Sequence, residues 1–216
     1  MASAKAIIVK PIKAAAANKL IKQIHYSGKV VPNSQLHLGV YLHGKLEGVM
    51  QFGPPINKKG TINIVADTKW NGMIELNRMA FSERLPRNSE SRAMAVAFKI
   101  IKKNYPHIEW IVSCSEATQC GDSTIYRAAG FVWTDIRRSD ALRINPETGD
   151  VMHVIQAHHK MISKEFRTWQ PTEGYQLRYV YFLNQAAKSR LTVPIIPFAK
   201  IDEVGASMYK GEKRGK

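Results

Sequence analysis

The sequence predicts a mixed α/β fold in which helices flank one β-sheet. Two strand-like segments flank a turn near residue 43, and strands and helices then alternate from residue 73 to residue 138. Such alternation after a hairpin is typical of a mixed sheet covered by helices. The chain has 216 residues, 44% of them hydrophobic, so it can bury a sizeable core. We expect one domain over residues 1–190 and a basic, loosely ordered tail over residues 191–216.

The first part of the chain supplies a helix, a hairpin and a third strand. Residues 12–25 predict an alanine-rich helix whose apolar positions are Ile12, Leu20, Ile21 and Ile24. Residues 35–53 predict two strands joined by a turn at residues 43–45. Residues 54–60 form a loop, and residues 73–81 form a strand. Regular alternation in that strand places on one face Glu75, Asn77 and Met79.

The second part alternates helices with strands. A helix begins near Ser89, carries an apolar stripe and is stopped by Pro106. Residues 108–115 form the apolar run of a buried strand. The next helix contains Tyr126 and ends at Gly130, a common helix terminator.

Two more strands and one ambiguous segment complete the pattern. Residues 131–138 follow Gly130 as a strand, and residues 175–183 alternate clearly. Residues 145–150 predict a turn. Residues 151–162 are compatible with either a strand or an amphipathic helix, and the sequence leaves that choice open.

Positive charge is the strongest feature of the composition. Lys and Arg number 32 against 17 Asp and Glu, a formal net charge of +15, and residues 1–46 contain seven lysines and no acid. Such an excess favours a polyanionic partner, because neutralised phosphates release counterions, although a basic surface without a specific partner would give the same count. If the partner is nucleic acid, the expected contacts are Lys19, Lys22, Lys29, Lys58, Lys59, Arg137 and Arg138.

Other global signals exclude several classes of protein. No run of about 18 apolar residues is present, so we expect no membrane span. The lysine-rich start does not have the pattern of a secretory signal peptide. The two cysteines, Cys114 and Cys120, are too few for a disulfide framework. A reduced, cytoplasmic protein is expected.

Six segments carry a resemblance to a known family. The resemblance covers roughly residues 20–140, and the segments occur in this order: HYSG at 25–28, GVYLHGKLEGVMQFG at 39–53, ELNRMAF at 75–81, PRNSESRAM at 86–94, IVSCSEA at 111–117 and STIYRAAGF at 123–131. Together they resemble the phage Mom family of DNA-modification proteins. The Tyr-x-x-x-Gly-Phe pattern also resembles the last helix of GNAT-type acyltransferases. The resemblance implies a GNAT-like mixed sheet, splayed at its centre, with the donor in the gap.

The same resemblance implies an activity. It points to a transferase that converts adenine in DNA to the N6-carbamoylmethyl (acetamido) derivative and so protects phage DNA from host restriction. The protein would act in the cytoplasm of the bacterial host, on double-stranded DNA, with an activated small-molecule or aminoacyl donor; a homodimer is left open. Acetyl-CoA enzymes carry a glycine-rich pyrophosphate loop where this chain has RLPRNSESRA. An acyl-CoA and a glycine-derived donor both remain open.

The chemistry of adenine defines what the site must contain. The exocyclic amine is a poor nucleophile, so its attack needs a proton acceptor and stabilisation of developing charge, and the base must leave the stack. The resemblance implies catalytic roles for His25, Tyr26, Glu75, Glu116 and Tyr126. Each also has a structural interpretation: His25 as an exposed helix-end histidine, Tyr26 as a core tyrosine, Glu75 in a strand-edge ion pair with other residues, Glu116 as a loop cap and Tyr126 as a core phenol.

A second group of residues would bind the donor: Arg78, Arg87, Asn88, Ser89, Ser113 and Asp122. Arginine suits a phosphate or carboxylate, and amides at a helix start can hold an anion. Alternatively, Asn88 or Ser89 caps the helix. The nitrogen and oxygen ligands of His25, Tyr26 and Glu116 would suit iron or another divalent metal.

Two other readings compete with the DNA-modifying one. The first is an ordinary GNAT N-acetyltransferase that acts on a protein or a small-molecule amine. The second is a basic DNA-binding protein without catalytic activity. The second explains the charge but not the ordered set of segments.

Overall fold

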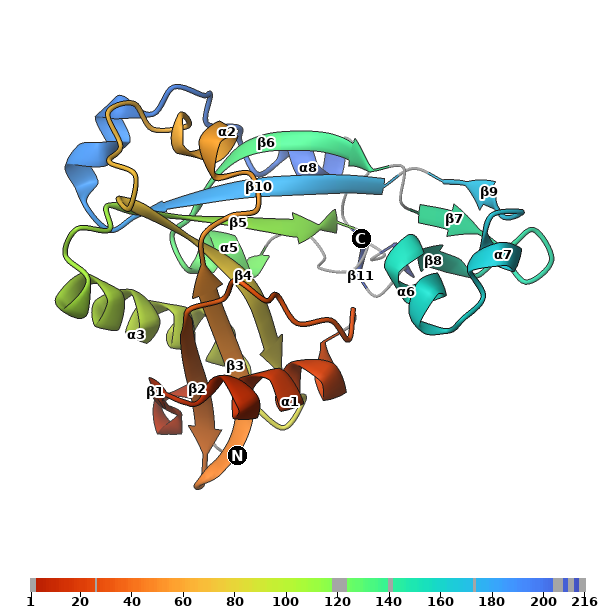
Figure 1. Ribbon diagram of the computed structural model, residues 1–216, viewed down its shortest axis with the longest axis horizontal. Helices are drawn as coiled ribbons and strands as arrows, with labels where there is room; N and C mark the ends of the chain where they lie inside the picture. The colour runs from red at the N-terminus through yellow and green to blue at the C-terminus, as the bar shows by residue number, and fades with distance from the viewer. Residues whose placement is uncertain are drawn as a thin grey trace.

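Seven strands form the main sheet of the protein in the computed structural model, in the order β1-β2-β3-β4-β5-β10-β6 (Figure 1). Their bounds are β1 Ile8–Pro11, β2 Leu36–Leu42, β3 Lys45–Gly53, β4 Met73–Phe81, β5 Trp110–Glu116, β6 Val132–Ser139 and β10 Gly174–Phe182. Only β4 and β5 run parallel; the other neighbours are antiparallel. The structure describes residues 3–25, 27–117, 124–139, 142–172, 174–203, 208–209 and 212–213.

Helices cover both faces of this sheet. The helices and 3-10 turns are η1 Ala4–Ala6, α1 Ala14–Ile24, α2 Lys58–Ile62, α3 Ser89–Asn104, α5 Thr124–Ala128, α6 Val154–His159, α7 Ser163–Phe166, η2 Gln185–Arg190 and α8 Lys200–Glu203. On one face, here called the α1 face, Ala17 and Ile21 of α1 pack on β3 and β4, while α2 and η2 cover Val112 and Val180. On the other, the α3 face, α3 and α5 pack on the main core cluster.

The sheet divides between its two parallel strands. β4 and β5 pair only at residues 73–75 and 110–112. Beyond that point β4 continues beside β3 and β5 continues beside β10, so the two strands diverge, as Figure 1 shows. The central split implied by the resemblance is therefore present.

A β-bulge changes the facing of residues in β4. The register shifts between Gln51 and Phe52, which lie opposite Arg78 and Leu76. Arg78 consequently lies on the α1 face together with Glu75, although three-residue spacing in a regular strand would separate them. Met79 packs against the α3-face core instead. The predicted shared face of Glu75 and Met79 is wrong, because alternation does not survive the extra residue.

Residues 142–172 form a small lobe between β6 and β10, on the right of Figure 1. The lobe contains α6, α7 and a sheet of β7 Leu142–Ile144, β8 Val151–His153 and β9 Gln170–Pro171, in the order β8-β7-β9. Its own core gathers Met152, Ala157, Phe166 and Trp169. The ambiguous segment at 151–162 is thus a strand followed by a helix. A further two-stranded sheet joins β11 Met208–Tyr209 and β12 Glu212–Lys213.

The chain after residue 190 returns to the main sheet. Leu191 pairs with Val65, and Ile196 pairs with Trp133. Ile201 is buried. In the described part of the chain, no helix is long and apolar enough to cross a membrane.

Candidate active site

Glu75, the last β4 residue paired with β5, lies at the start of the split on the α1 face. Burial raises the pKa of its carboxyl from 4.5 to about 7, although the Arg78 guanidinium and a hydrogen bond from the Asn77 side chain oppose that shift. Asn77 Oδ1 in turn accepts a hydrogen bond from Ser34 Oγ at 3.1 Å. A carboxyl that titrates near neutral pH is suited to accepting and releasing a proton. The structure thus brings Glu75 and Arg78 together, although regular strand alternation would place them on opposite faces.

His25, which follows α1, joins the same cluster. Arg78 donates to the Lys29 carbonyl through Nε (3.2 Å) and to the Asn77 carbonyl through a terminal nitrogen (2.8 Å), so it holds the loop after α1 against β4. Burial first, and then the charge of Arg78, lowers the pKa of the His25 imidazole to about 4. His25 is therefore neutral at pH 7. It is not an exposed helix-end histidine.

The hydrogen bonds of His25 define which ring nitrogen carries the proton. Nδ1 accepts from the Ser27 amide at 3.1 Å and lies 2.8 Å from Ser27 Oγ. In a neutral imidazole the proton is then on Nε2, so the ring offers a donor there. A metal-bound histidine normally donates from its other nitrogen, which is the opposite arrangement. His25 thus does not fit the predicted role of metal ligand, and no described group of three or more His, Cys, Asp or Glu side chains could hold a metal.

A pocket of about 200 Å³ lies beside this cluster on the α1 face. Strands β5, β10 and β6 form its floor and α2 forms its rim; its lining residues are Asn57, Gly60, Thr61, Ile64, Cys114, Asp135, Arg137, Gln176 and Arg178. Cys114 connects it to Glu75, because the Glu75 charge contributes, after burial, to raising the pKa of the Cys114 thiol to about 12. Because its pKa is raised so far, Cys114 stays a neutral thiol at pH 7. A volume below the roughly 300–1,000 Å³ of drug-sized ligand sites suits a single planar base.

The charges in the pocket are held in fixed positions. Asp135 contacts Arg137 at 2.8 Å and Arg178 at 3.2 Å. Arg178 also donates through Nε to Thr134 Oγ1 at 3.1 Å. Burial lowers the pKa of the Arg178 guanidinium, while Asp135 opposes that shift. The two arginines outnumber the carboxylate, so the pocket floor favours a polar or anionic ligand.

Tyr126 lies on the opposite face of the sheet, at the same split. Its hydroxyl is hydrogen-bonded to Ser113 Oγ at 3.1 Å, and Ser113 Oγ donates to the Leu76 carbonyl at 3.4 Å. The Tyr126 ring stacks on Tyr179 with centroids 4.2 Å apart and planes inclined by 6°. The predicted site residues are therefore divided between the two faces, with Tyr126 and Ser113 on the α3 face.

The start of α3 does not have the predicted cap. Asn88 occupies the capping position with φ 70°, but its side chain makes no capping hydrogen bond. The Ser89 hydroxyl is buried and has no hydrogen-bond partner among the described residues. The prediction of a side-chain cap is wrong, because neither Asn88 nor Ser89 makes a capping hydrogen bond with its side chain. Arg87 is exposed beside this helix start.

The structure describes one of the three remaining predicted site residues, Glu116. Glu116 is buried at the end of β5 and pairs in register with Gln176, on the α1 face. Tyr26 and Asp122 lie outside the described residues. Three further residues that are not among the predicted site residues also lie here: Asn77, Cys114 and Asp135. For Cys114 the sequence did hold an indication, because residues two apart in a strand share a face and Cys114 is two residues before the predicted site residue Glu116.

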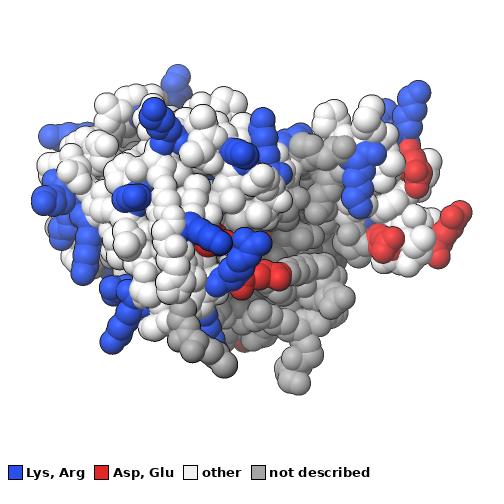
Figure 2. Space-filling model, turned by 90° about the horizontal axis from the view of Figure 1, so that it is seen from below, with Lys and Arg blue, Asp and Glu red and all other residues white. Residues whose placement is uncertain are grey.

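The predicted DNA contacts lie mainly on or around the α1 face. Lys19 and Lys22 are exposed on α1, Lys58 and Lys59 belong to α2, and Arg137 lines the pocket. Arg138 is exposed on β6, whereas Lys29 is half-buried in the loop after α1. Figure 2 shows Lys and Arg side chains spread over the main body, while Asp and Glu are few, at its centre and on the lobe.

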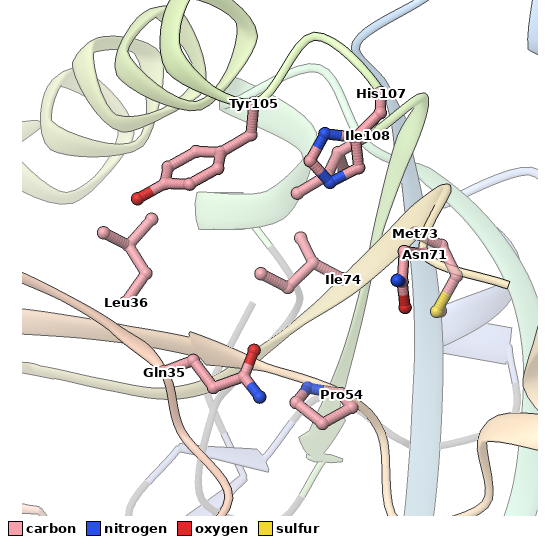
Figure 3. A pocket seen from close by; sticks show the side chains of 9 residues that line it. All are labelled: Gln35, Leu36, Pro54, Asn71, Met73, Ile74, Tyr105, His107 and Ile108. Atoms are coloured by element: carbon pink, nitrogen blue, oxygen red, sulfur yellow. The ribbon is translucent and has the colours of Figure 1, made fainter.

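A larger cavity of about 430 Å³ lies at the start of β4 (Figure 3). Its described lining residues are Gln35, Leu36, Pro54, Asn71, Met73, Ile74, Tyr105, His107 and Ile108. Figure 3 shows Tyr105 and His107 on one side, facing Leu36 and Gln35 on the other. None of the predicted site residues lines this larger cavity, whereas the smaller pocket is lined by Arg137 and by Cys114, whose thiol is close enough to Glu75 for the carboxylate to raise its pKa. We therefore place the chemistry at the smaller pocket.

Solved structures define the class of fold. The spermidine/spermine N-acetyltransferase SpeG of Vibrio cholerae superposes with a TM-score of 0.53 at 7% identity, covering 86% of this chain and 98% of that one. An agmatine N-acetyltransferase superposes with a TM-score of 0.50 at 10% identity, covering 82% and 99%. The chain therefore has the GNAT acetyltransferase fold.

Sequence comparison defines the family within that fold. The chain belongs to the Mom protein family, which matches residues 6–200. The methylcarbamoylase Mom of Escherichia phage Mu is 33% identical over 202 residues, covering 88% of this chain and 81% of the phage Mu protein. The family resemblance is confirmed.

Proposed function

We propose that this protein is a methylcarbamoyl transferase that converts adenine in double-stranded DNA to its N6-carbamoylmethyl derivative. Membership of the Mom family and similarity to the phage Mu methylcarbamoylase support this reaction. The net charge of +15 supports a DNA substrate. By the same reasoning the protein acts in the cytoplasm of the bacterial host and shields phage DNA from restriction.

The single observation that carries the mechanism is the position of Glu75. Its carboxyl has a pKa of about 7, lies at the start of the β4–β5 split and neighbours Cys114 in the pocket floor. In our proposal a flipped adenine enters this pocket from the α1 face and directs its exocyclic amine towards Glu75. The donor enters the split from the α3 face.

The transfer step requires one proton acceptor and one proton donor. The lone pair of the adenine N6 forms a bond to the electrophilic carbon of the donor, and the bond between that carbon and the leaving group breaks with its electron pair. Glu75 accepts the proton that N6 loses. Tyr126 supplies a proton to the leaving group, and Ser113, bonded to Tyr126, replaces it.

The other predicted residues hold the reactants in place. The fixed guanidinium of Arg78 provides donors beside Glu75, and the Nε2–H of His25 provides a further donor beside Arg78. Arg87 and the uncapped first turn of α3 provide an anion site for the donor. Because the hydrogen bonds of His25 do not match a metal ligand, no step is assigned to a metal.

Nucleoside mass spectrometry on plasmid DNA from cells that express the chain tests this function. We expect a deoxyadenosine heavier by one carbamoylmethyl group, reduced to background by Glu75→Gln and strongly reduced by Tyr126→Phe. Glu165→Gln, an exposed change on the lobe, is the matched control and should leave the yield unchanged. Unmodified adenine in cells with well-folded, DNA-binding protein would overturn the proposal and return attention to an ordinary amine N-acetyltransferase.

A further inference from the structure

The loop between β3 and α2 presents a large apolar side chain to solvent. Ile56 is 94% exposed, the highest value among the exposed large hydrophobic residues of the described chain. Single exposed apolar residues are common on protein surfaces and need no explanation by themselves. The surroundings of Ile56 are what distinguish it.

The loop that carries Ile56 is rigidly anchored. Pro54 and Pro55 precede it and fix two backbone angles, and Pro55 is buried. Asn57 follows, and its Oδ1 accepts a hydrogen bond from the Gly60 amide at 3.1 Å. The backbone of this loop is therefore constrained, so little backbone entropy is lost when Ile56 inserts into a partner.

Positive charge and an aromatic ring flank the same loop. The Lys58 ammonium lies 4.5 Å from the centroid of the Trp70 ring and donates to Asn71 Oδ1 at 3.1 Å. Trp70 is itself 55% exposed, and Lys59 is exposed next to Lys58. Loops 54–59 and 69–71 therefore form one basic, partly apolar surface.

This surface borders the pocket that we assign to the flipped base. Asn57, the residue after Ile56, lines that pocket together with Gly60 and Thr61 of α2. The opposite wall is Arg137 and Arg178. A duplex whose phosphates meet Lys58, Lys59 and Arg137 would pass over the loop that carries Ile56, which is one residue from the pocket rim.

We infer that Ile56 is a wedge that enters the DNA base stack and occupies the space left by the flipped adenine. This inference rests on the proposed function, since it needs a DNA duplex and an extruded base. Branched apolar side chains are used in this way by proteins that unstack a base step. Enzymes that act on a base must take it out of the duplex, and a wedge keeps the vacated stack from closing.

The other exposed apolar residues fit this role less well. Met161 is 91% exposed, but it belongs to the lobe, among the exposed acids Glu147, Asp150 and Glu165. Ile8 is 63% exposed on β1, at the far edge of the sheet from β5 and β10. Neither borders the pocket. They are therefore suitable controls.

Fluorescence of 2-aminopurine, which rises when the base leaves the stack, tests the inference. One duplex fragment is prepared as a series that carries 2-aminopurine at each adenine position in turn. Wild type should raise the fluorescence several-fold in at least one duplex. Ile56→Ala should remove at least half of that rise, with DNA affinity changed less than about threefold and an unchanged melting temperature. Met161→Ala and Ile8→Ala should behave as wild type, and Ile56→Leu should restore the signal.

The outcomes separate the wedge from the reaction. A full fluorescence rise with Ile56→Ala, a loss with Met161→Ala, or no rise in any duplex that binds would overturn the wedge. Nucleoside mass spectrometry on the same proteins reports the reaction independently. Modified adenine with fluorescence that does not depend on Ile56 overturns the wedge alone, whereas an Ile56-dependent rise without modified adenine overturns the proposed reaction alone.

Discussion

The hydroxyl of Tyr126 lies 3.1 Å from Ser113 Oγ, and Ser113 also reaches across the split to the Leu76 carbonyl. This chain joins the helix α5, the strand β5 and the strand β4 at the point where the sheet divides. Since Ser113 donates to Leu76, Tyr126 donates to Ser113. The phenol is therefore held in one place and connected to a second hydroxyl that can exchange its proton.

Removing the two hydroxyls separately should give unequal losses. Tyr126→Phe removes the proposed proton donor, and we expect a loss of modification rate on the order of 10²-fold or more, with DNA binding unchanged. Ser113→Ala leaves the phenol in place, so we expect a loss of roughly tenfold. Single-turnover rates measured by nucleoside mass spectrometry check both. Equal losses would contradict the separate roles, and the double variant should be no slower than Tyr126→Phe.

The pH dependence of the reaction should report Glu75. Because the pKa of Glu75 is raised to about 7, the carboxylate needed as proton acceptor forms as pH rises through about 7. The rate at saturating DNA should therefore increase from pH 6 to pH 8 and then level off. Glu75→Gln should lower the rate about 10²–10⁴-fold and remove that rise. A pH profile of wild type that is flat over this interval would exclude Glu75 as the acceptor.

The same carboxyl should cost stability at neutral pH. Its folded pKa lies above the ordinary 4.5, so the folded protein binds a proton more tightly than the unfolded chain, and stability is lost as pH rises from 4.5 to 7. The full cost is on the order of 3 kcal/mol, and Glu75→Gln should remove most of it.

Urea unfolding of the wild type and of Glu75→Gln at pH 5 and pH 8 measures this difference. We expect the variant to gain stability relative to wild type only at pH 8. Comparing the two proteins cancels groups such as His25, whose lowered pKa makes stability fall as pH decreases from 6.5 to about 4. A gain of equal size at both pH values would show that the effect is packing and not charge.

DNA affinity should depend on salt through the basic rim of the pocket. Replacing Lys58, Lys59 and Arg137 by alanine removes three expected phosphate contacts, so the slope of log affinity against log salt should become shallower by about 2.7. Replacing Lys99, Lys102 and Lys103, which are exposed on α3, makes the same change in charge on the other face. Filter binding between 50 and 200 mM salt compares the two triple variants. The rim assignment fails if both slopes change equally.

The order of the main helices and strands can be predicted from the local spacing of apolar residues in the sequence. The apolar stripe of α3 and the alternation of β10 each depend on local spacing, and both elements occur where they are predicted. The short strands of the lobe do not show such spacing. Neither does β1, in which three of four residues are exposed, so no inward-facing alternation marks it.

The site is less visible in the sequence because it depends on contacts between distant segments. Glu75 and Arg78 attract attention as neighbours, but only the bulge opposite Gln51 brings both to one face. The neutrality of His25 depends on burial against Arg78, which is 53 positions away along the chain, and no local pattern encodes that contact. Cys114 becomes part of the site only through its cross-strand partner Arg178.

The lobe has a consequence for how this family could change over time. It encloses its own core of Met152, Ala157, Phe166 and Trp169, and it is inserted where β6 turns back into β10. Substitutions there can alter an outer surface without repacking the residues at the split. The outer surface of the lobe and the residues that carry the reaction would then be free to evolve at different rates.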